Sequence, residues 1–310
     1  MIMKKMFFLL FCAACVVTAN AGEGALKGYF SVNSSGDKVA FSKGNLQYQA
    51  STSSFQFAEN QFEILGDANN AISSTNAGWI DLFGWGTSRY VQYPYLTSTT
   101  ATDYGNGEND IANTNYDWGV CNPIINGGYS AGKWRTLTKE EWQYMLEDRM
   151  SALYLRGQAT VNGIHGYVIL PDNFLVPGIT WKGSPNNWTD NTLTLEQWGK
   201  MEDAGAVFLP VADHREGTHT YDGDYGYYWT SSYATSKLAY CLLFEGTSSS
   251  ITSEVRYRGL SVRLVQAYEA PTAITEIHSN KSQSQKVFRD GQLLIERDGK
   301  TYTVQGQEVK

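Results

Sequence analysis

The stretch that decides the fold begins Gly226-Tyr-Tyr-Trp-Thr-Ser-Ser-Tyr233 and ends Gly259-Leu-Ser-Val-Arg-Leu-Val265. Short aromatic segments of high β-propensity are separated by Ser, Thr and Gly turns, and the stretch closes on an alternating strand, Ser261–Val265. This pattern predicts a small twisted sheet that carries side chains on both faces.

The rest of the chain favours an α+β fold rich in strands and loops, because only 18% of its residues are charged and long amphipathic helical stretches are almost absent. Two short helices are predicted, because Thr138–Glu141 and Thr194–Gln197 are capping boxes, and Gly205 marks the end of the second. Strands are expected at 29–32, 39–41, 46–48, 55–57, 166–171 and 206–210, with three or four more before residue 265.

Residues 1–21 have the layout of a secretory signal peptide: a basic start at Lys4-Lys5, an apolar run from Met6 to Val17, and a small-residue exit at Ala19-Asn-Ala21. The apolar run is shorter than the about 20 residues that span a bilayer, so we predict export to the extracellular space or outer surface and no transmembrane segment. Lipidation at Cys15 stays an alternative, although the residue three positions before it is not aliphatic.

Net charge argues against nucleic acid as a partner. Without Lys4 and Lys5 the chain keeps 22 basic residues against 31 acidic ones, a net charge of −9, and no Lys/Arg-rich run is present. After cleavage two cysteines remain, Cys121 and Cys241. A disulfide between them is possible in an oxidising compartment, but a chain of this length does not need one to bury a core.

The composition changes near residue 268. We predict a main domain over 22–267, a linker over 268–285 and a C-terminal β-hairpin tail over 286–310, in which Asp290-Gly291 and Asp298-Gly299 are turns. The tail resembles the short β tails of many exported Bacteroidetes proteins, some of which are type IX sorting signals. An accessory hairpin is the alternative.

Several separated motifs carry a family resemblance. Trp134–Tyr144 resembles the helix entry of formylglycine-generating-enzyme-like domains, which have the C-type lectin-like fold. The motifs Gly226–Tyr233, Ala239–Phe244 and Arg256–Val265 are similar to those of secreted Bacteroidetes-type proteins and Fibrobacter major paralogous domains. The resemblance covers roughly 28–266 and implies a C-type lectin-like fold with twisted antiparallel sheets, two short helices and long packed loops.

Some members of this wider group are targets of diversity-generating retroelements, and their last strands and loops display variable residues that bind ligand. Carried over to this chain, the resemblance places a set of side chains in the core: Trp229, Tyr240, Leu242, Phe244, Val262 and Leu264. Alternate residues of a strand face opposite ways, so the neighbouring positions would point outward. The implied ligand-binding residues are Tyr233, Thr235, Lys237, Cys241, Leu243, Glu245, Thr247, Tyr257, Arg258 and Leu260.

The motifs argue against catalysis and against a cofactor. Formylglycine-generating oxidases of this fold need a pair of thiols near the last strands to bind copper, and here Cys241 stands alone. The calcium-dependent sugar site of true lectins lacks its Glu-Pro-Asn or Gln-Pro-Asp triplet. His214 and His219 could hold a metal, and the oxygen-rich loop 103–110 could hold calcium, but a solvated loop is favoured for each.

The sequence therefore predicts a non-enzymatic binding protein for an unknown protein or glycan ligand. No metal or cofactor is assigned. A structural or adhesin subunit of the cell surface is the alternative.

Overall fold

The computed structural model describes residues 23–175 and 178–269, together with 285–289, 292–297, 300–303 and 306–309. The chain divides into two compact units, 1–268 and 269–310, and each is described by itself. The predicted signal peptide, residues 270–284 of the predicted linker and both predicted Asp-Gly turns of the tail lie outside the described residues.

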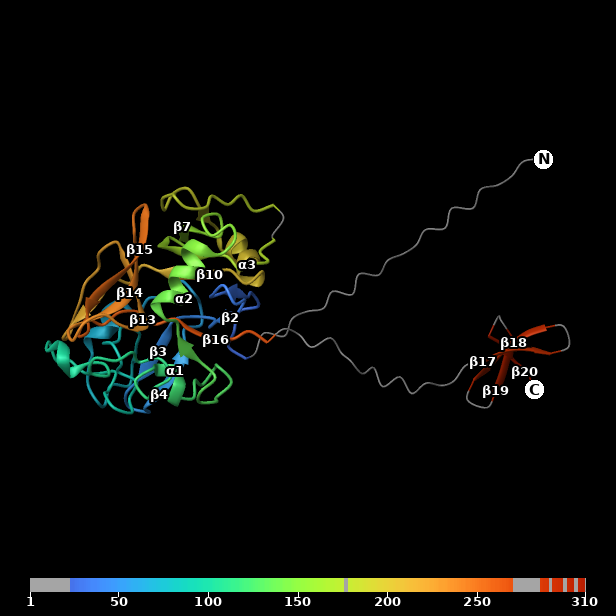
Figure 1. The fold of residues 1–310 in the computed structure, drawn as a ribbon, viewed down its shortest axis with the longest axis horizontal. Coiled ribbons are helices and arrows are strands. Elements are labelled where there is room, and N and C mark those ends of the chain that lie inside the picture. The colour runs from blue at the N-terminus through green and yellow to red at the C-terminus, as the bar shows by residue number, and fades with distance from the viewer. Residues whose placement is uncertain are drawn as a thin grey trace. The chain divides into compact units, whose positions relative to one another are not determined.

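The larger unit is α+β, with mostly sheets and a few short helices (Figure 1). Its two largest sheets have the orders β1–β2–β16–β6 and β10–β8–β7–β9. Their bounds are β1 Phe30–Ser31, β2 Lys38–Phe41, β16 Leu264–Ala267, β6 Arg135–Thr136, β10 Val207–Pro210, β8 Ile164–Ile169, β7 Arg156–Val161 and β9 Thr192–Leu193. All pairs are antiparallel except β7 with β9.

Three smaller sheets complete this unit, in the orders β4–β3–β5, β11–β12 and β13–β14–β15. Their bounds are β4 Ser54–Phe57, β3 Leu46–Gln49, β5 Trp79–Ile80, β11 Arg215–Glu216, β12 His219–Thr220, β13 Tyr225–Tyr233, β14 Leu238–Glu245 and β15 Ser248–Val255. The smaller unit is an antiparallel sheet of β17 (Gln285–Arg289), β18 (Gln292–Arg297), β19 (Lys300–Thr303) and β20 (Glu308–Val309).

The two predicted helices are confirmed, and their capping boxes explain where they begin. The Thr138 hydroxyl accepts a hydrogen bond from the Glu141 amide at 3.2 Å, and the Glu141 carboxylate accepts one from the Thr138 amide at 2.9 Å. This pair opens α2 (Lys139–Gln143), which continues into the π-helical turn η3 (Tyr144–Asp148). A second box opens α3 (Leu195–Asp203), which ends before Gly205, a residue at φ +92°.

A third helix, α1 (Trp118–Cys121), was not predicted because it is a single turn inside a long loop region. Its cap is Asp117, whose carboxylate also accepts hydrogen bonds from the amide and hydroxyl of Thr136 on β6. Burial raises the pKa of Asp117 to about 6, although these hydrogen bonds act in the opposite direction. The chain also forms 3₁₀ turns at η1 (Gly66–Asn70) and η2 (Ala101–Asp103).

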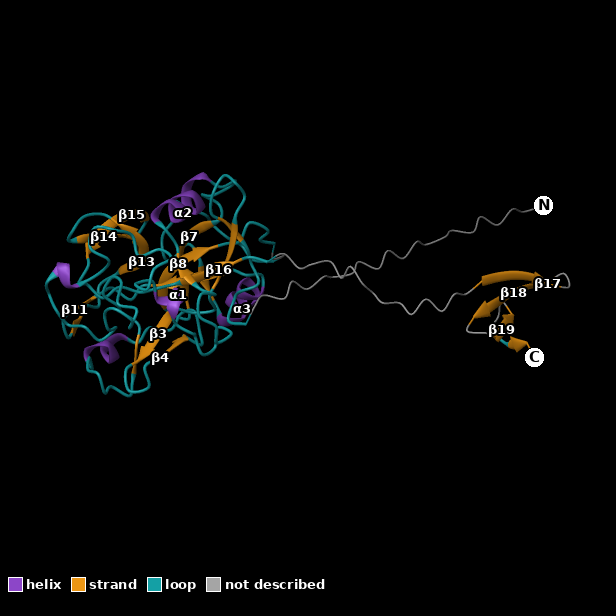
Figure 2. Cartoon of the chain, turned by 60° about the horizontal axis from the view of Figure 1, so that its bottom comes forward, coloured by secondary structure: helices purple, strands orange, loops and turns teal. Residues whose placement is uncertain are grey.

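Loops make up much of the unit, as Figure 2 shows, and they pack around tryptophans. Trp85, Trp118 and Trp134 are each no more than 1% exposed, and all three belong to a core cluster that also contains Trp229 of β13. We call it the first cluster. A second cluster surrounds Trp142, Tyr228 and Phe244, and a third lies around Trp198. The sheet β13–β14–β15 contributes side chains to the first two.

Candidate functional site

The sheet β13–β14–β15 contains most of the predicted site, and its pairing register decides which residues share a face. On β14, even-numbered residues lie on one face and odd-numbered residues on the other, so we name them the even face and the odd face. Leu242 pairs with Tyr228 and Ile251 on the even face, whereas Leu243 pairs with Tyr227 and Ser250 on the odd face.

The even face is closed at the end that carries Leu242 and Phe244. Leu242 and Phe244 are fully buried in the second cluster, and the Phe244 ring stacks at 5.2 Å from Tyr167 and 5.9 Å from Tyr228. Their predicted core positions are confirmed, as are those of Trp229, Val262 and Leu264. Tyr240 is a correction: it is only half-buried, with the Lys139 ammonium 4.2 Å from the centre of its ring.

The odd face is closed at one end, which overturns two predictions. Cys241 and Leu260 were expected to point outward, yet both are 0% exposed and belong to the first cluster. The physical reason is a covering segment after β5. Phe83 and Leu260 exchange backbone hydrogen bonds of 2.9 and 3.0 Å, and the Phe83 carbonyl accepts a 2.7 Å hydrogen bond from the Trp229 indole.

The remaining predicted residues lie at four places. Tyr233, Thr235 and Lys237 lie at the β13–β14 turn, whereas Thr247 lies at the β14–β15 turn. β14 has eight residues, so these turns are about 26 Å apart. Between them are two half-buried residues at the open end of the odd face, Leu243 and Glu245, and after β15 come two more, Tyr257 and Arg258. A small ligand cannot touch both turns at once.

A buried arginine, Arg256, supports the turn that contains Tyr233 and Thr235. One terminal nitrogen of Arg256 donates to the Thr235 carbonyl and the other to the Gly107 carbonyl, each at 2.7 Å. Its guanidinium lies 4.7 Å from the centre of the Trp85 ring and 5.0 Å from that of Tyr233. The backbone of this turn is therefore fixed.

The predicted loop 103–110 takes part in the same support. The Asp110 carboxylate accepts a 2.7 Å hydrogen bond from the Tyr233 amide, and Gly107 is bound by Arg256. Residues of this loop thus anchor the β13–β14 turn.

Arg258 joins β11 to β15 through two carboxylates. Its Nε donates to Glu216 at 2.8 Å and one terminal nitrogen donates to Glu254 at 2.7 Å. Partial burial by itself would lower the pKa of Arg258, but the hydrogen bonds and charges of the two glutamates raise it above its ordinary value. The Arg258 side chain is 29% exposed, so part of it remains open to a ligand.

An aromatic group adjoins this ion-pair cluster. Tyr227 and Tyr225 stack at 6.0 Å on the open end of the odd face, and the His214 ring lies edge-on to Tyr227 and stacks on Tyr221 at 4.5 Å. Burial, followed by the charges of Glu254 and Asp213, raises the pKa of Tyr227 to about 12. Its hydroxyl is therefore a hydrogen-bond donor throughout the physiological range.

Sequence reasoning missed this aromatic group. Tyr225 and Tyr227 have the same parity as Trp229, and the β13–β14 register places that parity opposite Leu243 and Glu245. Assuming the pairing register of the β13–β14 hairpin would have placed these two tyrosines beside the predicted residues Leu243 and Glu245. His214 and Tyr221 come from loops beside β11 and β12, and no local pattern places them against the sheet.

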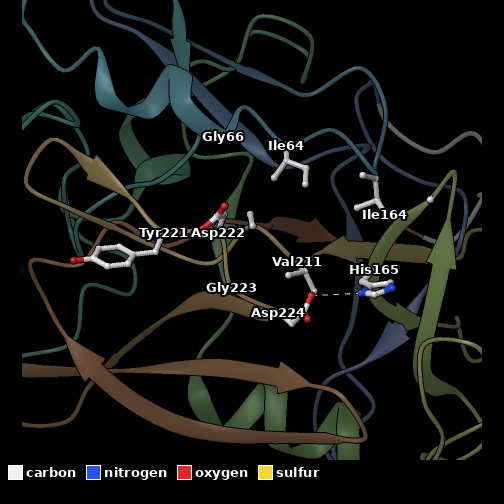
Figure 3. Close-up of a pocket in the computed structure, with 11 residues that line it drawn as sticks. Ile64, Gly66, Ile164, His165, Val211, Tyr221, Asp222, Gly223 and Asp224 are labelled. Carbon is white, nitrogen blue, oxygen red and sulfur yellow. Dashed lines mark ion pairs between the residues drawn. The ribbon is translucent and has the colours of Figure 1, made fainter.

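Tyr221, whose ring stacks on His214, also lines a cleft. Figure 3 shows part of it, a cavity of about 360 Å³ between residues 64–66, β8 and the loop 221–224. A second cavity of about 420 Å³ adjoins it, because Gly66, Ala212, Tyr221 and Asp222 line both.

The chain offers little for metal or thiol chemistry in its described part. Cys121 and Cys241 are both free, and burial raises the pKa of each thiol, that of Cys241 far above its ordinary value. His214 binds Asp213 at 2.5 Å instead of joining a ligand set. Over the described residues, no three His, Cys, Asp or Glu side chains are grouped to hold a metal ion.

Among the described residues, no helix has the length and apolar character to cross a membrane.

Comparisons with known proteins do not identify the chain. It matches no family model, and no curated protein and no solved structure shows significant similarity to it.

Proposed function

We propose that this chain is an exported, non-enzymatic binding protein built on a C-type lectin-like domain. The observation that carries the proposal is the surface at the open end of the odd face. There Tyr225 and Tyr227 stack, and the Tyr227 ring lies edge-on to that of His214. The His214 ring is 3.6 Å from the Glu216 carboxylate, which together with Glu254 holds Arg258 in place. Tyrosine and arginine are the residues that dominate recognition surfaces, because they offer a large, rigid contact area with polar tips.

The architecture supports the domain assignment. The second and last strands of the larger unit, β2 and β16, are paired, with Val39 opposite Ala267. Two capped helices, twisted antiparallel sheets and a long loop region packed around tryptophans match what the resemblance implies. A ligand on this surface contacts side chains whose backbone is fixed by sheet pairing, so little conformational entropy is lost on binding.

Array binding tests the proposal. Labelled protein is applied to an array of glycans and of purified surface proteins, and each bound spot is titrated. We expect Tyr225→Ala and Arg258→Ala to weaken binding by about tenfold or more each, as for central contact residues. Tyr129→Ala is the matched control, because Tyr129 is 70% exposed and lies in the loop before β6. Equal binding by all three variants would remove the assignment.

One observation favours a structural or adhesin subunit as the second candidate. β15 is an edge strand, and within the described residues it pairs only with β14. Open edges can pair with another chain. Analytical ultracentrifugation of the protein from micromolar to millimolar concentration distinguishes the two candidates. Reversible assembly would support a structural or adhesin subunit, and a monomer at every concentration would exclude that function.

A further inference from the structure

We propose that the cleft beside Tyr221 is a second binding site, which accepts a cationic alkyl group such as a lysine or arginine side chain of a peptide. The inference is independent of the proposed function, because it concerns the cavity between residues 64–66, the β7–β8 turn and the loop 221–224. The cavity adjoins the surface at the open end of the odd face through Tyr221, whose ring stacks on His214, but Tyr225, Tyr227 and Arg258 do not line it.

Aliphatic side chains line part of the cavity. Ile64, Ile164, Val211 and Ala212 line it, each half-buried, and Gly66, Gly163 and Gly223 add no side-chain bulk. In Figure 3 the side chains of Ile64 and Val211 lie between Asp222 and His165. A cavity of about 360 Å³ has room for an extended alkyl chain, whose methylenes would replace water against these side chains.

Negative charge lies at the rim of the cavity. Asp222 and Asp224 follow each other two residues apart in an exposed loop, and of the described residues that line the cavity none is Lys or Arg. Asp222 makes no hydrogen bond or ion pair within the described part of the chain, and Asp224 lies 3.6 Å from Nδ1 of His165. Asp222 thus has no partner among the described residues and Asp224 has only His165. Two carboxylates beside aliphatic side chains suit a ligand with an apolar stem and a positive head.

The walls are held in place. The His165 ring stacks on Trp188 at 5.1 Å, with only 6° between the ring planes. Tyr221 stacks on His214, and the Asp213 carboxylate accepts a 2.7 Å hydrogen bond from the Gly223 amide. The loop that carries both aspartates is thereby tied to the β11 side of the unit, so the site exists before a ligand arrives.

Titration of the isotope-labelled protein, followed by amide chemical shifts, tests the site. The probes are Nα-acetyl-lysine methylamide, Nα-acetyl-arginine methylamide and the uncharged Nα-acetyl-norleucine methylamide. We expect the two cationic probes to shift the amides of residues 163–165 and 221–224, with an affinity that falls as sodium chloride is raised. Norleucine should bind more weakly than both, because it has the stem without the head.

Asp222→Asn and Asp224→Asn should each raise the Kd for the lysine probe by about twofold to fivefold, the range of exposed ion pairs. Asp148→Asn is the matched control: it removes the same charge from an exposed position at the end of η3 and should leave the Kd unchanged.

Three outcomes would overturn the inference: no shifts with any cationic probe, equal binding of norleucine, or an equal effect of Asp148→Asn. A response of the same amides to methyl glycosides but not to the cationic probes would assign the cleft to sugars instead. Array binding through Tyr225 and Arg258 could persist in each case, so failure here is distinguishable from failure of the proposed function.

Discussion

The two faces of β14 differ in which end of the strand is covered. On the even face, Leu242 and Phe244 are fully buried, whereas Leu238 and Tyr240 are half-buried. On the odd face the chain buries Cys241 just as completely, yet leaves Leu243 and Glu245 half-exposed. Each face is thus closed at one end and open at the other, and the closed ends lie at opposite ends of the strand.

The alternation of residues along a strand predicts the face on which each side chain lies. Whether that side chain is exposed depends on which other segments of the chain cover the face. The period of two correctly separates Leu242 from Leu243. It cannot say that the segment after β5 reaches across the odd face and covers Cys241 while stopping short of Leu243. Candidate contact residues are therefore those on the odd face that no other segment covers.

The largest expected effect is the difference in stability loss between a residue at the closed end of the even face and one at the open end of the odd face. Phe244→Ala should lower the free energy of unfolding by about 3–5 kcal/mol, because it removes a ring that packs against Tyr167 and Tyr228. Leu243→Ala should lower it by less than about 1 kcal/mol, since that side chain is already half-exposed. Urea unfolding measures both, and equal losses would contradict the distinction between the faces.

The second effect concerns the segment that covers the odd face. Asp81 lies in this segment, fully buried, and accepts hydrogen bonds from the Asn69 amide group at 2.8 Å and the Leu65 amide at 3.2 Å. Burial raises the pKa of its carboxyl from 3.8 to about 6. The folded state therefore holds a proton that the unfolded state has released between these pH values.

The stabilising contribution of this proton is complete below pH 3.8 and is lost as the pH rises through about 6. Asp81→Asn should remove this pH dependence of the free energy of unfolding. Between pH 4 and pH 7 we expect wild type to lose up to about 3 kcal/mol of unfolding free energy relative to the variant. Urea titrations at several pH values measure the difference in unfolding free energy between wild type and variant. A difference that does not change with pH would contradict the prediction, because it would mean that Asp81 is ionised in the folded state.

The third effect compares the two thiols. Cys241→Ser places a hydroxyl in the first cluster and should cost about 1–3 kcal/mol, because a buried hydroxyl without a partner loses its hydration. Cys121→Ser should stay within about 0.5 kcal/mol, since Cys121 is only partly buried. Thermal unfolding of both variants measures this, and a harmless Cys241→Ser would mean that the odd face is open there too.

The smallest effect concerns the ion pairs of Arg258. Arg258→Met should change the unfolding free energy by no more than about 1 kcal/mol, because the ion pairs with Glu216 and Glu254 are partly exposed. High salt should reduce the difference further. A loss comparable with that of Phe244→Ala would show that this cluster holds the fold together and is not free for recognition.

Local chemistry made much of the fold predictable. The capping boxes at Thr138 and Thr194 begin the helices, and the apolar alternation around Leu242 and Phe244 defines a buried face. The candidate site was less predictable, because half of it comes from elsewhere in the chain. His214, Glu216 and Tyr221 reach the sheet through loops whose path depends on long-range contacts.

By itself the sequence determined the two capped helices, several of the strands and the side of β14 on which each residue lies, because these depend on neighbours a few residues apart. Tertiary structure alone decided that Cys241 and Leu260 are covered, that Arg258 bridges Glu216 and Glu254, and that a cleft forms beside Tyr221. Such outcomes depend on which distant segments meet, and pairing with Phe83, 177 residues before Leu260 in the chain, leaves no trace in local periodicity.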